Sequence, residues 1–231
     1  MRNGHFHIQS FRRLGSAVLF IAFLGFGEQS AATDLPSIGG SGGSPYRILC
    51  PAGSFLTGFE GRAGDYVDRL GLVCSKWSGS ELESGQFQHV YAGTSRGGKA
   101  QQVFCPAQHV VHGADFSVLS SDAQLLDEFS FECIYMKRPE GNGQRFNFTS
   151  TGSRGGWSFG GRSGWHFCPP DEVVIGIYGR SGDFVDRIGL VCDLTPQARF
   201  QSLVLRILAV LVATFGLGVV LRRKWIGIKK S

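Results

Sequence analysis

The chain has 231 residues, with 23 Lys and Arg, 18 Asp and Glu, and a formal net charge of +5. The positive excess lies at the ends, since residues 33–201 contain 14 basic and 17 acidic residues, whereas residues 1–32 carry +2 and residues 202–231 carry +6. A nucleic-acid-binding surface needs Lys and Arg clustered on the folded domain. The charge distribution therefore argues against nucleic acid as a partner, and the 34 glycines indicate many tight turns.

Residues 1–32 have the three-part pattern of a secretory signal peptide. A basic start precedes a short apolar run, Ala17 to Phe26, and Ser30 and Ala32 supply the small residues that a signal peptidase recognises. An uncleaved N-terminal anchor is the alternative, but the apolar run is short for a membrane span. We predict cleavage near Ala32 and an exported body, residues 33–197.

The exported body contains three copies of one unit, each bounded by two cysteines. The segments Cys50–Cys74 and Cys168–Cys192 align without a gap and are identical at 14 of 25 positions, while Cys105–Cys133 is a divergent copy four residues longer. A glycine pair stands eight and seven residues before the first cysteine of every copy. These pairs are Gly42-Gly43, Gly97-Gly98 and Gly160-Gly161, and the three repeats cover about residues 39–77, 92–137 and 151–194.

The repeat also predicts the disulfide bonds, which the export signal permits. Six cysteines allow 15 pairings, but identical units should close identically. Zinc is a poor alternative because the chain has no Cys-x-x-Cys pair. The expected bonds are Cys50–Cys74, Cys105–Cys133 and Cys168–Cys192.

The units are predicted to consist of β-strands, because their segments are short, rich in β-branched and aromatic residues, and bounded by glycine. Alternation would place Phe55, Thr57 and Phe59 on one face of a strand. No segment of the body has a sustained helical apolar period. We therefore expect an all-β domain in which each unit forms one antiparallel sheet and three sheets bury their inner faces as a prism.

The segment Gly-Arg-x-Gly-Asp-x-Val-Asp-Arg occurs twice and contains the candidate binding residues. Its glycines permit a tight turn, its two carboxylates accept hydrogen bonds, and an aromatic ring lies between them in sequence. This combination suits a sugar, whose hydroxyls form hydrogen bonds and whose C–H face stacks on a ring. A purely structural role for these loops is the alternative. The candidate residues are Gly64, Asp65, Tyr66 and Asp68 in the first copy and Gly182, Asp183, Phe184 and Asp186 in the third.

Residues Leu203 to Leu221 form an apolar stretch of 19 residues, about 28 Å long as a helix, which is close to one bilayer core. Arg206 interrupts it near one end, where its side chain can reach the interface. The basic tail 222–231 indicates a cytoplasmic C-terminus. We predict a single-pass protein of the secretory pathway or cell envelope, with an amphipathic or buried helix, or a processed sorting signal, as alternatives.

The two Gly-Asp loops resemble the sugar-binding loop of jacalin-related lectins, a Gly-x-x-x-Asp pattern before an apolar strand. Gly64 to Asp68 and Gly182 to Asp186 fit that spacing, and the glycine pairs resemble the glycine loop beside the sugar in the mannose-binding branch. The resemblance implies a β-prism I fold and metal-independent glycan binding through both loops, with Gly42, Gly43, Gly160 and Gly161 beside the sugar. The Cys-bounded repeat is also similar to vitelline membrane outer layer proteins, which share this fold.

The sequence departs from the lectin pattern in two places. Asp65 and Asp183 stand where those lectins often have an aromatic residue, so the loops could instead hold a cation. The middle unit has Ala123 where glycine is expected before Asp127. We therefore expect two competent sites that face different directions, no cofactor, no metal and no enzymatic activity, although Asp65 and Asp68 could flank a glycosidic bond. A structural or protein-binding ectodomain is the runner-up.

Overall fold

A computed structural model describes residues 32–118, 124–138, 143–148 and 161–228. The chain divides into two compact units, Ala31–Arg199 and a second that contains Phe200–Ser231. The first unit is all-β, and the predicted signal peptide lies outside the described residues except for Ala32. The strands are β1 (Thr33–Asp34), β2 (Ile38–Gly39), β3 (Ser44–Leu49), β4 (Ser54–Ala63), β5 (Val67–Lys76), β6 (Gln86–Gly93), β7 (Lys99–Phe104), β8 (His109–Val118), β9 (Leu126–Tyr135), β10 (Gln144–Phe148), β11 (Gly161–Phe167), β12 (Glu172–Ser181) and β13 (Val185–Leu194).

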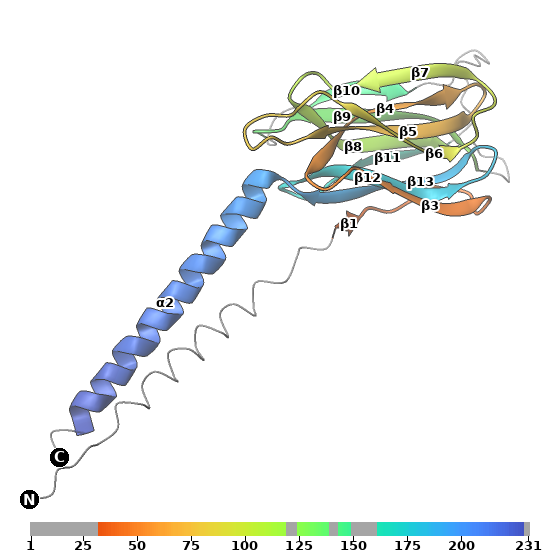
Figure 1. The fold of residues 1–231 in the computed structure, drawn as a ribbon. Coiled ribbons are helices and arrows are strands. Elements are labelled where there is room, and N and C mark those ends of the chain that lie inside the picture. Colours follow the sequence, from red (N-terminus) through yellow and green to blue (C-terminus); the bar gives the residue numbers. More distant parts are fainter. Residues whose placement is uncertain (1–31, 119–123, 139–142, 149–160, 229–231) are drawn as a thin grey trace, which may run out of the picture. The chain divides into compact units, whose positions relative to one another are not determined.

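These strands form three antiparallel sheets (Figure 1). Sheet I has the order β6-β5-β4-β7 and sheet II the order β10-β9-β8-β11. Sheet III has the order β1-β13-β12-β3, with β2 also paired to β13. The central strands β4, β8 and β12 contact one another pairwise, so the three sheets enclose one core. This arrangement confirms the expected prism.

The expectation that each unit forms its own sheet is wrong. The strand before the first cysteine of a unit pairs with the hairpin of another unit: β7 pairs with β4, β11 with β8, and β3 with β12. Strand β3 of the first unit thereby closes the circle by pairing with the hairpin of the last unit. Every sheet therefore contains strands from two units, because an antiparallel strand pairs with whichever edge lies beside it in space.

The core consists of apolar side chains that all three sheets direct inward. Phe59 of β4 meets Phe129 and Phe131 of β9 edge to face, with ring centroids 4.9 and 5.0 Å apart. Ile177 of β12 and Leu70 of β5 are fully buried in the same cluster. Edge-to-face contacts add roughly 0.5–1.5 kcal/mol per pair to the burial of such rings.

Bulges change which side chains face this core. The register of β4 against β5 shifts between Leu56 and Gly58. Because of that shift, Phe55 packs in a separate apolar cluster, whereas Leu56 and Phe59 lie in the central one. The expected common face of Phe55, Thr57 and Phe59 is therefore wrong, since one extra residue reverses the alternation.

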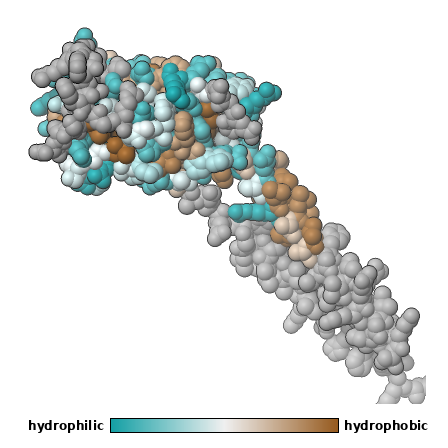
Figure 2. Space-filling view, turned by 180° about the vertical axis from the view of Figure 1, so that it is seen from behind, coloured by the Kyte–Doolittle hydropathy of each residue, from teal (hydrophilic) through white to brown (hydrophobic). Residues whose placement is uncertain are grey.

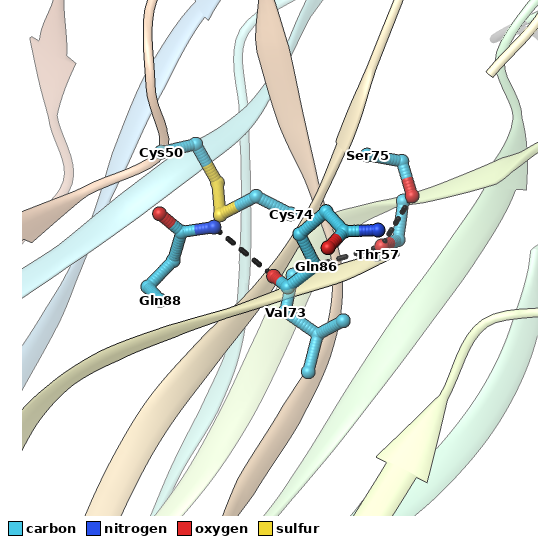
Figure 3. The surroundings of a disulfide bond; sticks show 7 residues. All are labelled: Cys50, Thr57, Val73, Cys74, Ser75, Gln86 and Gln88. Carbon is cyan, nitrogen blue, oxygen red and sulfur yellow. Dashed lines mark hydrogen bonds between the residues drawn. A yellow bond between two sulfur atoms is a disulfide. The ribbon is translucent and has the colours of Figure 1, made fainter. Parts of the chain in front are cut away.

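The three disulfides pair as predicted, and each one joins two different sheets. Cys50 follows β3 of sheet III and bonds to Cys74 in β5 of sheet I. Figure 3 shows this disulfide together with the nearby side chains of Thr57 and Ser75, whose hydroxyl groups form a hydrogen bond. The remaining bonds join sheet I to sheet II and sheet II to sheet III. They are Cys105–Cys133 and Cys168–Cys192.

The C-terminal helix α2 (Pro196–Ile228) begins directly after the last strand. The hydroxyl of Thr195 accepts a hydrogen bond from the Ala198 amide, and Pro196 occupies the first helical position, where its missing N–H costs nothing. Residues Pro196–Thr214 are long and apolar enough to span a membrane. Most of their apolar side chains are exposed, with Phe200 at 67% and Val212 at 71%, and Figure 2 shows the described part of the helix as largely hydrophobic.

Candidate functional site

Both Gly-Asp loops are the turns of β-hairpins at the centre of their sheets. Residues 64–66 connect β4 to β5, and residues 182–184 connect β12 to β13. In each turn the first glycine donates its backbone N–H to the carbonyl two residues on: Gly64 to Tyr66 at 2.9 Å and Gly182 to Phe184 at 3.0 Å. The second carboxylate of each motif follows in the strand that begins there. The two turns therefore have the same conformation, as their near-identical sequences require.

A glycine pair lies against each turn, and the exchange of strands between units decides which pair meets which turn. Gly97 and Gly98 precede β7 and lie against the first loop, whereas Gly42 and Gly43 precede β3 and lie against the third-unit loop. Sequence reasoning missed Gly97 and Gly98 as site residues. The regular glycine spacing contained the signal, but strand exchange between units decides which pair meets which loop.

The arginine of each motif holds its glycine pair in place. Arg62 donates to the carbonyls of Gly97 and Gly98 at 2.8 and 2.7 Å. In the other copy, the Arg180 side chain donates to both carbonyls of the Gly42-Gly43 pair, at 2.9 and 2.6 Å. Each arginine side chain therefore fixes the backbone of its glycine pair beside the carboxylates.

The glycines bring the main chain into direct contact with the second aspartate. A Cβ atom on Gly97 would lie 2.1 Å from Asp68 Oδ1, and one on Gly42 would lie 2.3 Å from Asp186 Oδ1. Both distances are far inside van der Waals contact. Only glycine therefore permits the aspartate to keep its position at each site.

One oxygen of each of these aspartates is buried and has no hydrogen-bond partner, namely Asp68 Oδ2 and Asp186 Oδ2. Asp68 is 6% exposed, and its burial raises the pKa of its carboxyl, although backbone hydrogen bonds and the charge of Arg62 act in the opposite direction. A buried acceptor without a partner costs roughly 1–3 kcal/mol. Each of the two aspartates therefore keeps one buried oxygen that has no hydrogen-bond partner in this structure.

An open cavity of about 450 Å³ surrounds the first loop. Asp65 is exposed at its edge, and Tyr66 is half-buried. The cavity also includes Phe184, which belongs to the other loop, because the rings of Tyr66 and Phe184 meet edge to face with centroids 5.3 Å apart. The lining residues are Gly64, Asp65, Tyr66, Asp68, Gly98, Lys99 and Phe184.

This contact corrects the expectation that the two loops face different directions. Their aromatic residues touch, so the loops lie side by side. They differ in one neighbour: Lys99 pairs with Ala63 at the first loop, whereas Ser44 pairs with Ser181 at the other. The first site therefore has an ammonium group where the second has a hydroxyl.

The middle unit does not join this site in the described residues. Ala123 and Gly160 lie outside the described residues, and Gly161 pairs with Val118 in sheet II, beside the divergent hairpin. Asp127, the counterpart of the second aspartate, is buried in β9. Among the described residues, no three His, Cys, Asp or Glu side chains form a group able to hold a metal ion.

A second cavity of about 490 Å³ lies beside sheet I and contains none of the predicted residues. Its buried polar groups already have partners, since Thr57 donates to the Val73 carbonyl and shares a 2.9 Å hydrogen bond with Ser75. Phe87 and Phe104 form its apolar wall. Size alone therefore does not make it the better candidate.

Solved structures with this three-sheet arrangement decide the fold. Calystegia sepium agglutinin matches with a TM-score of 0.52 and 16% identity over 72% of this chain and 99% of its own. A complex of artocarpin with mannopentose matches with a TM-score of 0.51 and 13% identity over 72% and 100%. This chain has the fold of the jacalin-related lectins. No family profile and no characterised protein matches its sequence.

The close contact between Gly97 and Asp68 can be tested by a substitution that adds a Cβ atom. On the sugar-binding hypothesis from the sequence, in an Asp186→Asn background where only the first loop keeps its second aspartate, Gly97→Ala should reduce sugar affinity at least roughly tenfold, because the new Cβ displaces Asp68. Gly53→Ala is the matched control, since Gly53 also has a positive φ but meets nothing within 4 Å. Both variants should lose stability through backbone strain, by roughly 1–2 kcal/mol. Equal affinities in a sugar titration would contradict the assignment.

Proposed function

We propose that this β-prism is a carbohydrate-binding protein without catalytic activity, and that the loops Gly64–Asp68 and Gly182–Asp186 bind sugars without a metal ion. The observation that supports this function best is the open cavity of about 450 Å³ at the first loop, which the carboxylates of Asp65 and Asp68 and the rings of Tyr66 and Phe184 line. A sugar hydroxyl donates a hydrogen bond to the carboxylate of Asp68 or Asp186, and Tyr66 or Phe184 offers a ring to the sugar C–H face. The glycine pairs allow the sugar ring to approach the main chain closely.

The fold adds support, because agglutinins share it and the artocarpin structure is a complex with mannopentose. Mannose-containing oligosaccharides are therefore the first probes to use. Asp68 and Asp186 act as hydrogen-bond acceptors in this proposal.

We also propose that α2 anchors the β-prism in a membrane, with the glycan-binding unit outside the cell or in the cell envelope. The exposed apolar side chains of residues Pro196–Thr214 support a lipid environment, and the three disulfides support an oxidising compartment. The basic residues at the end of the chain favour a cytoplasmic C-terminus.

A structural or protein-binding ectodomain is the competing proposal. The Arg62 and Arg180 hydrogen bonds support it, because they make both loops part of the contacts that join exchanged strands to their sheets. On this interpretation the loops stabilise the fold and bind no sugar.

A glycan array probed with the fragment 31–199 separates the two proposals. We expect binding to a group of related glycans, unchanged in the presence of a chelator. Loss of binding with the chelator would favour a cation held by the paired carboxylates. The absence of binding to every glycan would overturn the carbohydrate proposal and leave the structural one.

A further inference from the structure

The two loops share one aromatic pair, and this contact is the starting point. Tyr66 and Phe184 occupy the same position in their motifs, between the two aspartates, and their rings meet at 5.3 Å with an interplanar angle of 73°. Both rings are half-buried, so part of each remains accessible to a ligand. The pair therefore lies on the boundary between the two candidate sites and belongs to both.

The cavity of the first loop depends on the other loop for part of its wall. Phe184 lines it together with Tyr66 and Asp68, although Phe184 lies in the hairpin of sheet III. A sugar bound to Asp68 in this cavity lies beside the ring of Phe184. A sugar bound to Asp186 lies in the loop that carries this same ring.

Each loop also contributes one aspartate carboxylate as an acceptor, since Asp68 lines the cavity of the first loop and Asp186 is only partly buried in the other. We propose that the two loops form one composite site that holds two units of a single oligosaccharide, and this inference rests on the proposed function. The rings of Tyr66 and Phe184 lie between the two units and form a shared platform on which both can pack. A ligand that occupies both halves binds the second unit intramolecularly. Its affinity then exceeds that of a monosaccharide by roughly 100-fold or more.

The two halves are not identical, which gives the composite site a direction. Lys99 borders the first loop, and Ser44 takes its place at the second. The ammonium group of Lys99 donates to sugar oxygens but cannot accept, whereas the Ser44 hydroxyl does both. A bound chain therefore presents different units to the two halves.

Stoichiometry tests the composite site directly. Calorimetric titration of the full-length protein in detergent micelles should give two molecules of methyl mannoside per chain but one molecule of mannopentaose, bound roughly 100-fold more tightly. Two molecules of mannopentaose per chain, or equal affinities, would overturn the composite site while leaving the proposed function intact. Absence of heat with both probes, together with a blank glycan array, would overturn the proposed function itself.

A variant tests whether Phe184 serves the first loop. In the Asp186→Asn background, one molecule of methyl mannoside should bind, and adding Phe184→Ala should weaken that binding by roughly 3- to 10-fold. Phe104→Ala is the control, because Phe104 is an exposed aromatic residue on β7, outside both loops. If Phe184→Ala changes the affinity no more than Phe104→Ala does, the proposal that both loops share the Phe184 ring is wrong.

Discussion

The double substitution Asp68→Asn and Asp186→Asn should abolish glycan binding while the β-prism stays folded. In the proposed sites, each change replaces one of the two carboxylate oxygens that could accept a sugar hydroxyl with an amide NH2 group that donates. A hydrogen bond to a charged acceptor contributes roughly 1.5–3 kcal/mol, so each site should lose about 10- to 100-fold in affinity. Because both sites are weakened at once, the double variant should give no signal on a glycan array.

The Asp68→Asn substitution should also change how the stability depends on pH, and the reason is the pKa of Asp68. Burial raises the pKa of the Asp68 carboxyl in the folded protein, so the folded state holds its proton more tightly than the unfolded state does. Ionising this group therefore costs stability as the pH rises through the folded pKa. Since Asn has no charge to ionise, the advantage of Asp68→Asn should be larger at pH 7 than near pH 4, as measured by Tm.

A charge-matched control separates the site from a general effect of net charge. Asp171 and Glu81 are exposed and lie outside both loops, and Asn and Gln retain their shapes. The variant Asp171→Asn with Glu81→Gln should bind glycans like the wild type. If the site variant instead loses stability and the wild type binds no glycan, the two aspartates have a structural role.

Removal of one disulfide, Cys168→Ser with Cys192→Ser, should lower the free energy of unfolding of fragment 31–199 by roughly 3 kcal/mol. The bond closes a loop with a sequence separation of 24 residues, and its loss restores conformational freedom mainly to the unfolded chain. Urea denaturation measures the change. A protein of ordinary stability would lose a large part of its total.

The other two disulfides provide an internal comparison. Their separations are 24 and 28 residues, and closure entropy grows only with the logarithm of loop length. Each of the three double-serine variants should therefore lose nearly the same free energy. A loss below roughly 1 kcal/mol for one pair would show that its loop is already restricted in the unfolded state.

Local features of the fold and the site were accessible from sequence because near-identical segments must fold alike. The match between Cys50–Cys74 and Cys168–Cys192 predicts equal disulfides, and these pairings are confirmed. The Gly-Asp motifs predict two similar turns, and the structure contains them with matching backbone hydrogen bonds. Repetition supplies this information without any knowledge of which segments meet in space.

Features that depend on spatial neighbours could not be read in the same way. No local pattern states that β7 pairs with β4, so Gly97 and Gly98 were missed as neighbours of the first loop. The contact between Tyr66 and Phe184 joins residues from two different units, and the sequence contains no signal for it. A bulge such as that near Gly58 depends on the register between two strands, which alternation within one strand does not reveal.

The disulfides have a further consequence, because each joins two sheets and together they connect sheet III to sheet I, sheet I to sheet II, and sheet II to sheet III. As a network of cross-links, the β-prism is a closed triangle. If a reductant cleaves any one of the three bonds, the other two still connect all three sheets to one another. Two bonds must break before any sheet loses its last cross-link, so the connectivity tolerates a single reduction event.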